Sequence, residues 1–169
     1  MCLGNICRSP LGELLLAARL PVTEFEVSSA GVMALVGQPM DADASVHAAA
    51  EGIDFSEFRA QQLTDAHVAD SDLVLTATKE LRSRVLSESP GALRRTFAVL
   101  EFADLLDHVS EPASRRDLVA KAAAARSLSR LDSHDIPDPY RRGEQAHHDS
   151  ADLMRGAVDR IAKGLTSLS

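Results

Sequence analysis

The sequence contains no tryptophan, a single tyrosine and only two cysteines among its 169 residues. The two cysteines, Cys2 and Cys7, both lie near the start of the chain, so a framework of structural disulfides is not expected. No apolar run approaches the roughly 18 residues of a membrane span, and the chain does not open with a basic segment followed by an apolar stretch. These absences predict a cytoplasmic protein with no membrane partner. They also indicate that the two cysteines have a chemical role rather than a structural one.

Basic residues are also in the minority, because the formal net charge is −7. Binding to nucleic acid depends on clustered lysine and arginine, so this charge argues against a DNA or RNA partner. Hydrophobic residues make up 45% of the chain, which is enough to build a core, and no internal repeat or linker is visible. We therefore expect a single domain that spans residues 1–169.

Apolar segments of two kinds alternate along the chain. Short runs rich in β-branched or aromatic residues are typical of strands, and longer segments with apolar residues three or four apart are typical of helices. Because strands that alternate with helices form parallel sheets, the pattern predicts an α/β fold with helices around a parallel sheet. The expected strands are 25–28, 72–76 and 97–100, and the expected helices are 10–20, 43–51, 101–106 and 144–165, with a further helix from about Lys79.

The first and last of these helices should each bury an apolar stripe. The Ala- and Arg-rich segment 107–131 should form an exposed helix whose charged side chains are solvated rather than a binding patch. The expected stripes are Leu11, Leu14, Leu15 and Ala18 in the first helix, and Leu153, Ala157 and Ile161 in the last.

The run Cys2–Pro10 places a thiol and a guanidinium on a short loop that opens a helix. Backbone N–H groups of such a loop can converge on one oxyanion, and the helix dipole adds positive potential at the same point. The same field favours the thiolate of Cys2, which is the nucleophilic form. Arg8 can donate two parallel hydrogen bonds to phosphate oxygens. The run therefore predicts a phosphate loop (Cys2–Ser9) with Cys2 as nucleophile and Arg8 as phosphate clamp.

A second stiff segment, the acid loop (Asp135–Tyr140), carries a carboxylate between two prolines. Attack of a thiolate on a phosphate monoester requires a proton for the departing oxygen. Asp138 lies between Pro137 and Pro139, which would aim it with little loss of entropy. We expect Asp138 to act as general acid and then to activate water, in a cycle that needs no metal and no cofactor.

The nine residues Cys2–Pro10 resemble the signature of the low-molecular-weight protein-tyrosine phosphatases, and the acid loop resembles the corresponding segment of that family. Further similar segments are 28–31, 36–39, 59–63 and 72–75. The resemblance implies a three-layer fold with a four-stranded parallel sheet, of the phosphotyrosine protein phosphatase I type. It also implies hydrolysis of phosphotyrosine in proteins through a phosphocysteine intermediate, with inorganic phosphate as product.

The resemblance also implies roles for the remaining residues of the site. Asn5 and Ser9 would shape the loop and hydrogen-bond the thiolate. Cys7 matches a second cysteine that can form a disulfide with the nucleophile, although a small buried hydrophobic residue is an equal interpretation. Tyr140 would line the mouth of the pocket and stack on the substrate ring. Ile6 is typical of tyrosine-directed members, whereas phosphoarginine-directed relatives tend to carry threonine, and Leu3 and Gly4 complete the expected phosphate-binding residues.

Two departures from the family pattern stand out. Phe58 replaces a histidine that braces the phosphate loop in the family, and only Met1 precedes Cys2 where the family has a central strand. Loss of a central strand would leave its neighbours with unpaired backbone groups. We expect the natural start to lie upstream, and we expect poor folding and weak activity of a chain that begins at Met1.

Two other functions remain open. A phosphate- or phosphotyrosine-binding module without turnover would fit the departures above, and an arsenate reductase would need an external thiol because no cysteine follows Cys7. A metal site at His147 and His148 is not expected, because neighbouring helical residues point about 100° apart. The composition fits a high-GC bacterium, and by analogy the substrate would be a bacterial tyrosine kinase.

Overall fold

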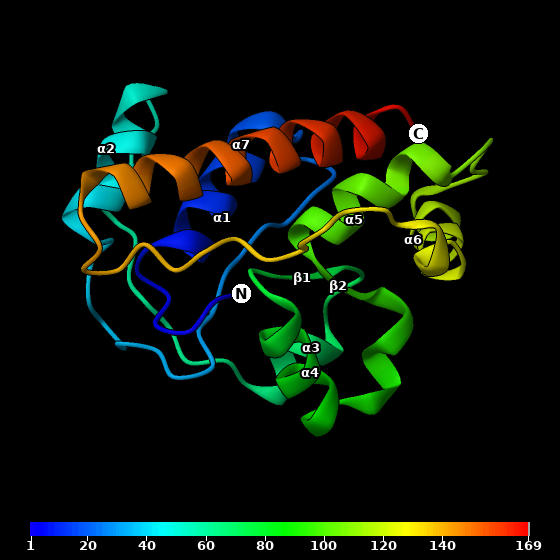
Figure 1. Cartoon of the computed structure of the whole chain (residues 1–169), viewed down its shortest axis with the longest axis horizontal. Helices are drawn as coiled ribbons and strands as arrows, with labels where there is room; N and C mark the ends of the chain where they lie inside the picture. Colours follow the sequence, from blue (N-terminus) through cyan, green and yellow to red (C-terminus); the bar gives the residue numbers. More distant parts are fainter. Residues whose placement is uncertain (169) are drawn as a thin grey trace.

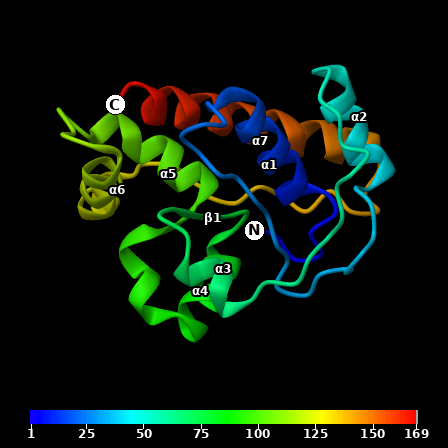
Figure 2. The same ribbon diagram turned by 180° about the vertical axis from the view of Figure 1, so that it is seen from behind.

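The computed structural model describes residues 1–168, and its secondary structure forms three layers (Figures 1 and 2). Its strands are β1 (Val74–Thr76) and β2 (Thr96–Ala98), and its helices are α1 (Arg8–Arg19), α2 (Ala42–Ala50), α3 (Asp65–Ala69), α4 (Lys79–Glu88), α5 (Val99–Leu105), α6 (Arg115–Ala124) and α7 (Glu144–Thr166). The two strands pair in parallel in the middle layer. Helices α1, α5 and α7 lie on one side of them, and α3 and α4 lie on the other. The expected α/β class and the parallel direction are confirmed.

On the other side of β1, the parallel pairing continues only as isolated hydrogen bonds and bridges within residues 1–168. The amino group of Met1 donates to the carbonyl of Leu75 at 2.6 Å, and the N–H of Ala77 donates to the carbonyl of Met1 at 2.9 Å. Isolated parallel bridges then join Cys2 to Gly31, and Gly31 to Gln62. Residues 1–168 thus contain two strands with isolated bridges beside them. We expected the four-stranded sheet of the family with its first strand missing from this chain, that is, three strands.

The prediction of a strand at 25–28 is wrong. This segment is extended, but the N–H groups of residues 26–29 donate no hydrogen bond within residues 1–168. A cavity of about 1330 Å³ separates it from β1, on the amino side of Met1, so no strand is close enough to pair with it. Apolar side chains from several elements line the cavity, including Leu16, Val27, Leu73, Leu75 and Val99.

The other strands and helices agree with the pattern to within a few residues, with one clear exception. Val99 and Leu100 were expected to end a strand, but they begin α5. The carboxylate of Glu101 accepts from the N–H of Ala98 at 3.0 Å, and this cap turns the backbone into a helix immediately after β2. A continuous apolar run is therefore divided between a strand and a helix.

The expected apolar stripes are partly correct. Ala18 and Leu153 are exposed, because α1 and α7 pack against each other through neighbouring positions. Helix α6 is not simply an exposed helix, since three of its apolar residues are buried. The buried apolar residues of α7 are Ala151, Met154, Ala157, Val158, Ile161, Ala162 and Leu165, and those of α6 are Leu118, Val119 and Ala122.

The core has two apolar clusters, one on each side of the strands. The larger packs α1, α5 and α7 around Phe97 and Phe102, and the smaller lies between β1 and α4. Cys2 belongs to the smaller cluster and Cys7 to the larger, so the phosphate loop passes from one side of the sheet to the other. No helix in the described part of the chain is long and apolar enough to cross a lipid bilayer.

Candidate active site

The backbone of the phosphate loop is held by its carbonyl groups. The carbonyls of Cys2, Leu3, Gly4 and Ile6 accept hydrogen bonds of 2.9–3.1 Å from N–H groups in the segment 32–41. In contrast, the N–H groups of residues 3–7 donate no hydrogen bond within residues 1–168. These donors lie at the start of α1, where the helix dipole adds positive potential, so they are available to an oxyanion.

The side chain of Asn5 is the centre of the loop. Asn5 is fully buried and has a left-handed backbone, with φ of 56°. Its amide donates to Ser9 Oγ at 2.8 Å and to Ser29 Oγ at 2.7 Å, and its oxygen accepts from the N–H of Gln61 at 2.8 Å. Ser9 Oγ in turn lies 2.9 Å from the sulfur of Cys2. The structure therefore brings Asn5 and Ser9 together behind the nucleophile.

Three residues that support this network were not identified from the sequence. Gln61 also donates to the carbonyl of Ser29 at 2.7 Å, and Ser29 donates to the carboxylate of Glu13 at 2.6 Å. Burial raises the pKa of Glu13. The segments 28–31 and 59–63 resemble segments of the family, but the sequence alone does not indicate that they meet at Asn5.

Gly31 and Phe58 show how the chain around segments 28–31 and 59–63 packs against the phosphate loop and the core. A Cβ on Gly31 would lie 2.5 Å from the carbonyl oxygen of Leu3, so any larger residue would displace the phosphate loop. Phe58 is half-buried and packs against the larger core cluster. The hydrogen bonds from this segment to Asn5 and Ser29 are made by Gln61.

Arg8 joins the phosphate loop to the acid loop. Its guanidinium is buried, donates to the carbonyl of Ile136 at 3.0 Å and lies 3.1 Å from the carboxylate of Asp138. Its Nε is buried without a hydrogen-bond partner among the described residues. An unpaired buried donor is costly, and an oxyanion in the loop would satisfy it.

The acid loop is anchored at its first two residues and open at its end. The N–H of Ile136 donates to the carbonyl of Ala77 at 2.9 Å, and Asp135 accepts from the N–H of Lys79 at 2.7 Å, which fixes the loop at the carboxyl end of β1. Asp138 keeps 41% of its side chain exposed. The carboxylate is thus held near Arg8 while it remains accessible to a substrate.

The other expected binding residues occupy different positions around the loop. Tyr140 is partly exposed, and the guanidinium of Arg141 lies 5.1 Å from the centre of its ring. Ile6 is buried, whereas the side chain of Leu3 is exposed and Gly4 is partly exposed.

Cys7 is a buried free thiol, as is Cys2. Burial is the largest cause that raises the pKa of the Cys7 thiol to about 12, and the carboxylate of Asp41 adds to it. Cys7 is therefore neutral at physiological pH, whereas a nucleophile must be ionised. Cys7 therefore does not suit the role of nucleophile, and Cys2 remains the residue that the sequence predicts for it.

Comparisons with known proteins identify the family of the chain. Residues 1–117 match the family model described as low molecular weight phosphotyrosine protein phosphatase. The chain belongs to this family. It is 33% identical over 159 residues to a probable low molecular weight protein-tyrosine-phosphatase, EpsP, of Ralstonia nicotianae, and the alignment covers 94% of this chain and 88% of EpsP.

Further relatives extend the similarity past the acid loop. The low molecular weight protein-tyrosine-phosphatase Etp of Escherichia coli K12 is 30% identical, over 98% of this chain and 92% of Etp. Among solved structures, the tyrosine phosphatase Wzb of Escherichia coli K30 in complex with sulphate has a TM-score of 0.74 at 29% identity, over 97% of this chain and 94% of Wzb. The YwlE arginine phosphatase of Geobacillus stearothermophilus has a TM-score of 0.75 at 26% identity, and the match covers 98% of this chain and 90% of YwlE.

Proposed function

We propose that this protein hydrolyses phosphotyrosine in proteins through a phosphocysteine intermediate. The observation that carries the proposal is the ion pair between Arg8 and Asp138, which brings the acid loop against the phosphate loop that carries Cys2. A nucleophile, a phosphate clamp and a proton donor are the three parts that this reaction needs. The relatives named as tyrosine phosphatases support the same substrate class.

In the first step, the sulfur of Cys2 attacks phosphorus and the bond from phosphorus to the tyrosyl oxygen breaks. Asp138 gives its proton to the departing oxygen, so the leaving group departs as a neutral phenol. The N–H groups of residues 3–7 and the guanidinium of Arg8 hold the three other phosphate oxygens. Phosphate at Arg8 would compete with its ion pair to Asp138, which frees that carboxyl group for proton transfer.

In the second step, the same carboxylate takes a proton from water, and the water oxygen attacks phosphorus. The bond from sulfur to phosphorus breaks, the thiolate of Cys2 is restored and inorganic phosphate leaves. Ser9 Oγ, 2.9 Å from the sulfur, can donate a hydrogen bond to the departing thiolate. No metal or cofactor takes part in these steps, and the cytoplasm would keep the thiol reduced.

A kinetic assay on a phosphotyrosyl peptide tests this proposal. The wild-type chain should release phosphate, and Cys2→Ser should lose all measurable activity because a hydroxyl is a far weaker nucleophile than a thiolate. Cys2→Ser should still bind the peptide. Equal phosphate release from both proteins would remove Cys2 as nucleophile, and binding without turnover by the wild type would favour the binding module.

Two comparison substrates define the reaction further. A phosphoarginyl peptide should be a poor substrate, since Ile6 occupies the position at which phosphoarginine-directed relatives tend to carry threonine. Arsenate reduction supported by an added thiol should be absent or slow, because an internal cysteine relay would need a cysteine after Cys7. The physiological substrate that we propose is a phosphotyrosine-containing protein such as a bacterial tyrosine kinase.

A further inference from the structure

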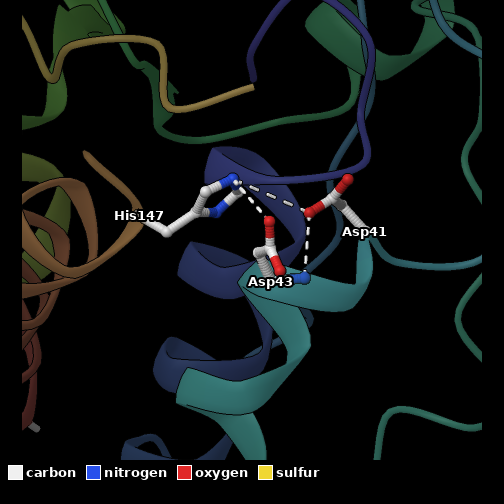
Figure 3. A group of neighbouring side chains, drawn as sticks. All are labelled: Asp41, Asp43 and His147. Carbon is white, nitrogen blue, oxygen red and sulfur yellow. Dashed lines mark hydrogen bonds and ion pairs between the residues drawn. The ribbon is translucent and has the colours of Figure 1, made fainter. Parts of the chain in front are cut away.

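Behind the phosphate loop, the start of α2 faces the first turn of α7. Three side chains point toward one another there: Asp41 and Asp43 from the start of α2, and His147 from α7 (Figure 3). His147 Nε2 lies 3.8 Å from an oxygen of Asp41 and 3.9 Å from an oxygen of Asp43. One ligand atom from each of the three residues lies within 4.8 Å of the others.

These contacts are too long to be hydrogen bonds. The side chain of His147 is only 2% exposed, and its ring makes no hydrogen bond to any of residues 1–168. The ring nitrogens of His147 therefore have no hydrogen-bond partner within residues 1–168 that an ion would have to displace. Both carboxylates are nevertheless directed at the same nitrogen, which leaves room for a shared partner between them.

We propose that Asp41, Asp43 and His147 bind one divalent transition-metal ion, for which Zn²⁺ is the best match. Zinc accepts imidazole nitrogen together with carboxylate oxygen, and sites with three protein ligands and one water are common. Two ligand atoms at about 2.0–2.1 Å from a tetrahedral zinc lie about 3.3–3.4 Å apart. His147 Nε2 lies 3.8 and 3.9 Å from the two carboxylate oxygens, so it needs to approach each of them by only about 0.5 Å. Magnesium and calcium prefer oxygen ligands throughout.

The surroundings of the three residues suit this role. Asp41 caps α2, and its carboxylate accepts from the N–H groups of Asp43 and Ala44 at 3.1 and 3.3 Å, which orients it before an ion binds. The side chain of Asp43 is 67% exposed, so the site is open to solvent on one side. An ion can therefore enter without unfolding the protein.

A bound ion would join the supports of both catalytic loops. The N–H of Asp41 donates to the carbonyl of Ile6 in the phosphate loop at 2.9 Å, and α7 follows the acid loop directly. The ion would take no part in the chemistry, because it lies behind the loop. Its effect would be to stabilise the contact between α2 and α7.

The neighbouring histidine provides a matched control. His148 is more than half exposed, lies 3.5 Å from Asp152 on the same helix, and stacks on the ring of His47 from α2 with 6.1 Å between ring centres. His147 and His148 are adjacent in the sequence, so their side chains point about 100° apart on the helix and cannot bind the same ion from one face. In the fold, the partners of His147 come from α2 instead.

Calorimetric titration with ZnCl₂ tests the proposal. The protein should carry Cys2→Ser and Cys7→Ser, so that thiols do not compete for zinc. We expect one ion per chain, and we expect the midpoint of thermal unfolding to rise by about 5 °C at saturating zinc. Asp43→Asn should lower the affinity at least about tenfold and His147→Gln should abolish binding, whereas His148→Gln should change neither.

Several results would overturn the proposal. They are the absence of stoichiometric binding, unchanged affinity in Asp43→Asn, or loss of binding in His148→Gln, which would place the ion at the exposed pair. If His147→Gln does not fold, Asp43→Asn decides the question, because Asp43 is exposed and its replacement does not disturb the core. A protein whose midpoint of thermal unfolding does not change with zinc would also overturn the proposal.

Discussion

The phosphate loop and the acid loop are held in different ways. In the phosphate loop, Asn5 and Ser9 are buried and hydrogen-bonded to each other behind the sulfur of Cys2. In the acid loop, the first residues are anchored to the carboxyl end of β1. Asp138 is partly exposed, and within residues 1–168 its carboxylate pairs with Arg8 and accepts a hydrogen bond from the N–H of Tyr140. The proposed nucleophile, Cys2, is thus positioned before a substrate binds, whereas the proposed proton donor, Asp138, is free to change its partner.

This difference follows from what each loop has to do. A phosphate ion must meet several N–H donors at once, so the donors must be fixed in advance. A general acid must first meet the leaving oxygen and later a water molecule, which requires some movement. Substitutions in the phosphate loop should therefore reduce stability and activity together, and substitutions in the acid loop should reduce activity alone.

Replacement of Asp138 should give the largest effect of the substitutions that separate the two loops. Asp138→Asn keeps the shape of the side chain but has no proton to donate, so kcat on a phosphotyrosyl peptide should fall by about a hundredfold to ten-thousandfold. The midpoint of thermal unfolding should change by less than about 2 °C, because a partly exposed ion pair stabilises little. Asp132→Asn, an exposed neighbour, serves as the control and should behave as wild type. A large loss of stability would mean that the acid loop is as rigid as the phosphate loop.

The sequence predicted the two loops more fully than the sheet around them. Cys2, Arg8 and Asp138 could be named because each carries a chemical function that the residue type itself indicates. Asn5 could be placed in the loop, but its contacts with Ser29 and Gln61 could not be predicted, because they depend on how three distant segments pack. The strand expected at 25–28 failed for a related reason, since a strand requires a neighbour that local periodicity does not reveal.

Replacement of Asn5 should give the second-largest effect. Asn5→Ala removes two donors and one acceptor inside the protein, so the free energy of unfolding should fall by about 2–3 kcal/mol and the midpoint by about 5–10 °C. Activity should fall as well, because Ser9 loses a partner. Asn5→Gly separates the two possible causes: it tolerates the positive φ of 56° but makes no side-chain hydrogen bond. If Asn5→Gly is as stable as wild type, backbone conformation and not the network determines the effect.

An extension of the chain before Met1 should raise the stability of the folded protein. The amino group of Met1 is buried beside β1, and this burial lowers its pKa from the ordinary value of 8.0. The unfolded chain then binds more protons below pH 8, so stability should rise as pH increases toward 8. Five apolar residues added before Met1 can fill the cavity beside β1 and turn the amine into a neutral amide, which should raise the midpoint by about 4–8 °C.

Five serines added at the same place are the control for that extension, because they also remove the charged amine but cannot bury apolar surface. Both extended chains should lose the rise in stability between the lowered pKa and pH 8, and only the apolar one should gain the full increase in midpoint. Equal midpoints for the two would show that the cavity does not accept an apolar strand. The acid loop offers no comparable site, because its anchors to β1 are already paired.

Cys7 should give the smallest effect on catalysis, although it lies in the same loop as the nucleophile. Since burial raises the pKa of Cys7 to about 12, its thiol stays protonated at pH 7 and also at pH 10. Iodoacetamide should therefore label the folded chain once, at Cys2, and Cys7→Ser should keep kcat within about threefold of wild type. Denaturation in urea returns the Cys7 pKa to its ordinary value, so mass spectrometry should then find two labels at pH 9. Fast labelling of Cys7 in the folded protein would show that the inner half of the phosphate loop opens to solvent, and the contrast between a fixed and a mobile loop would no longer hold.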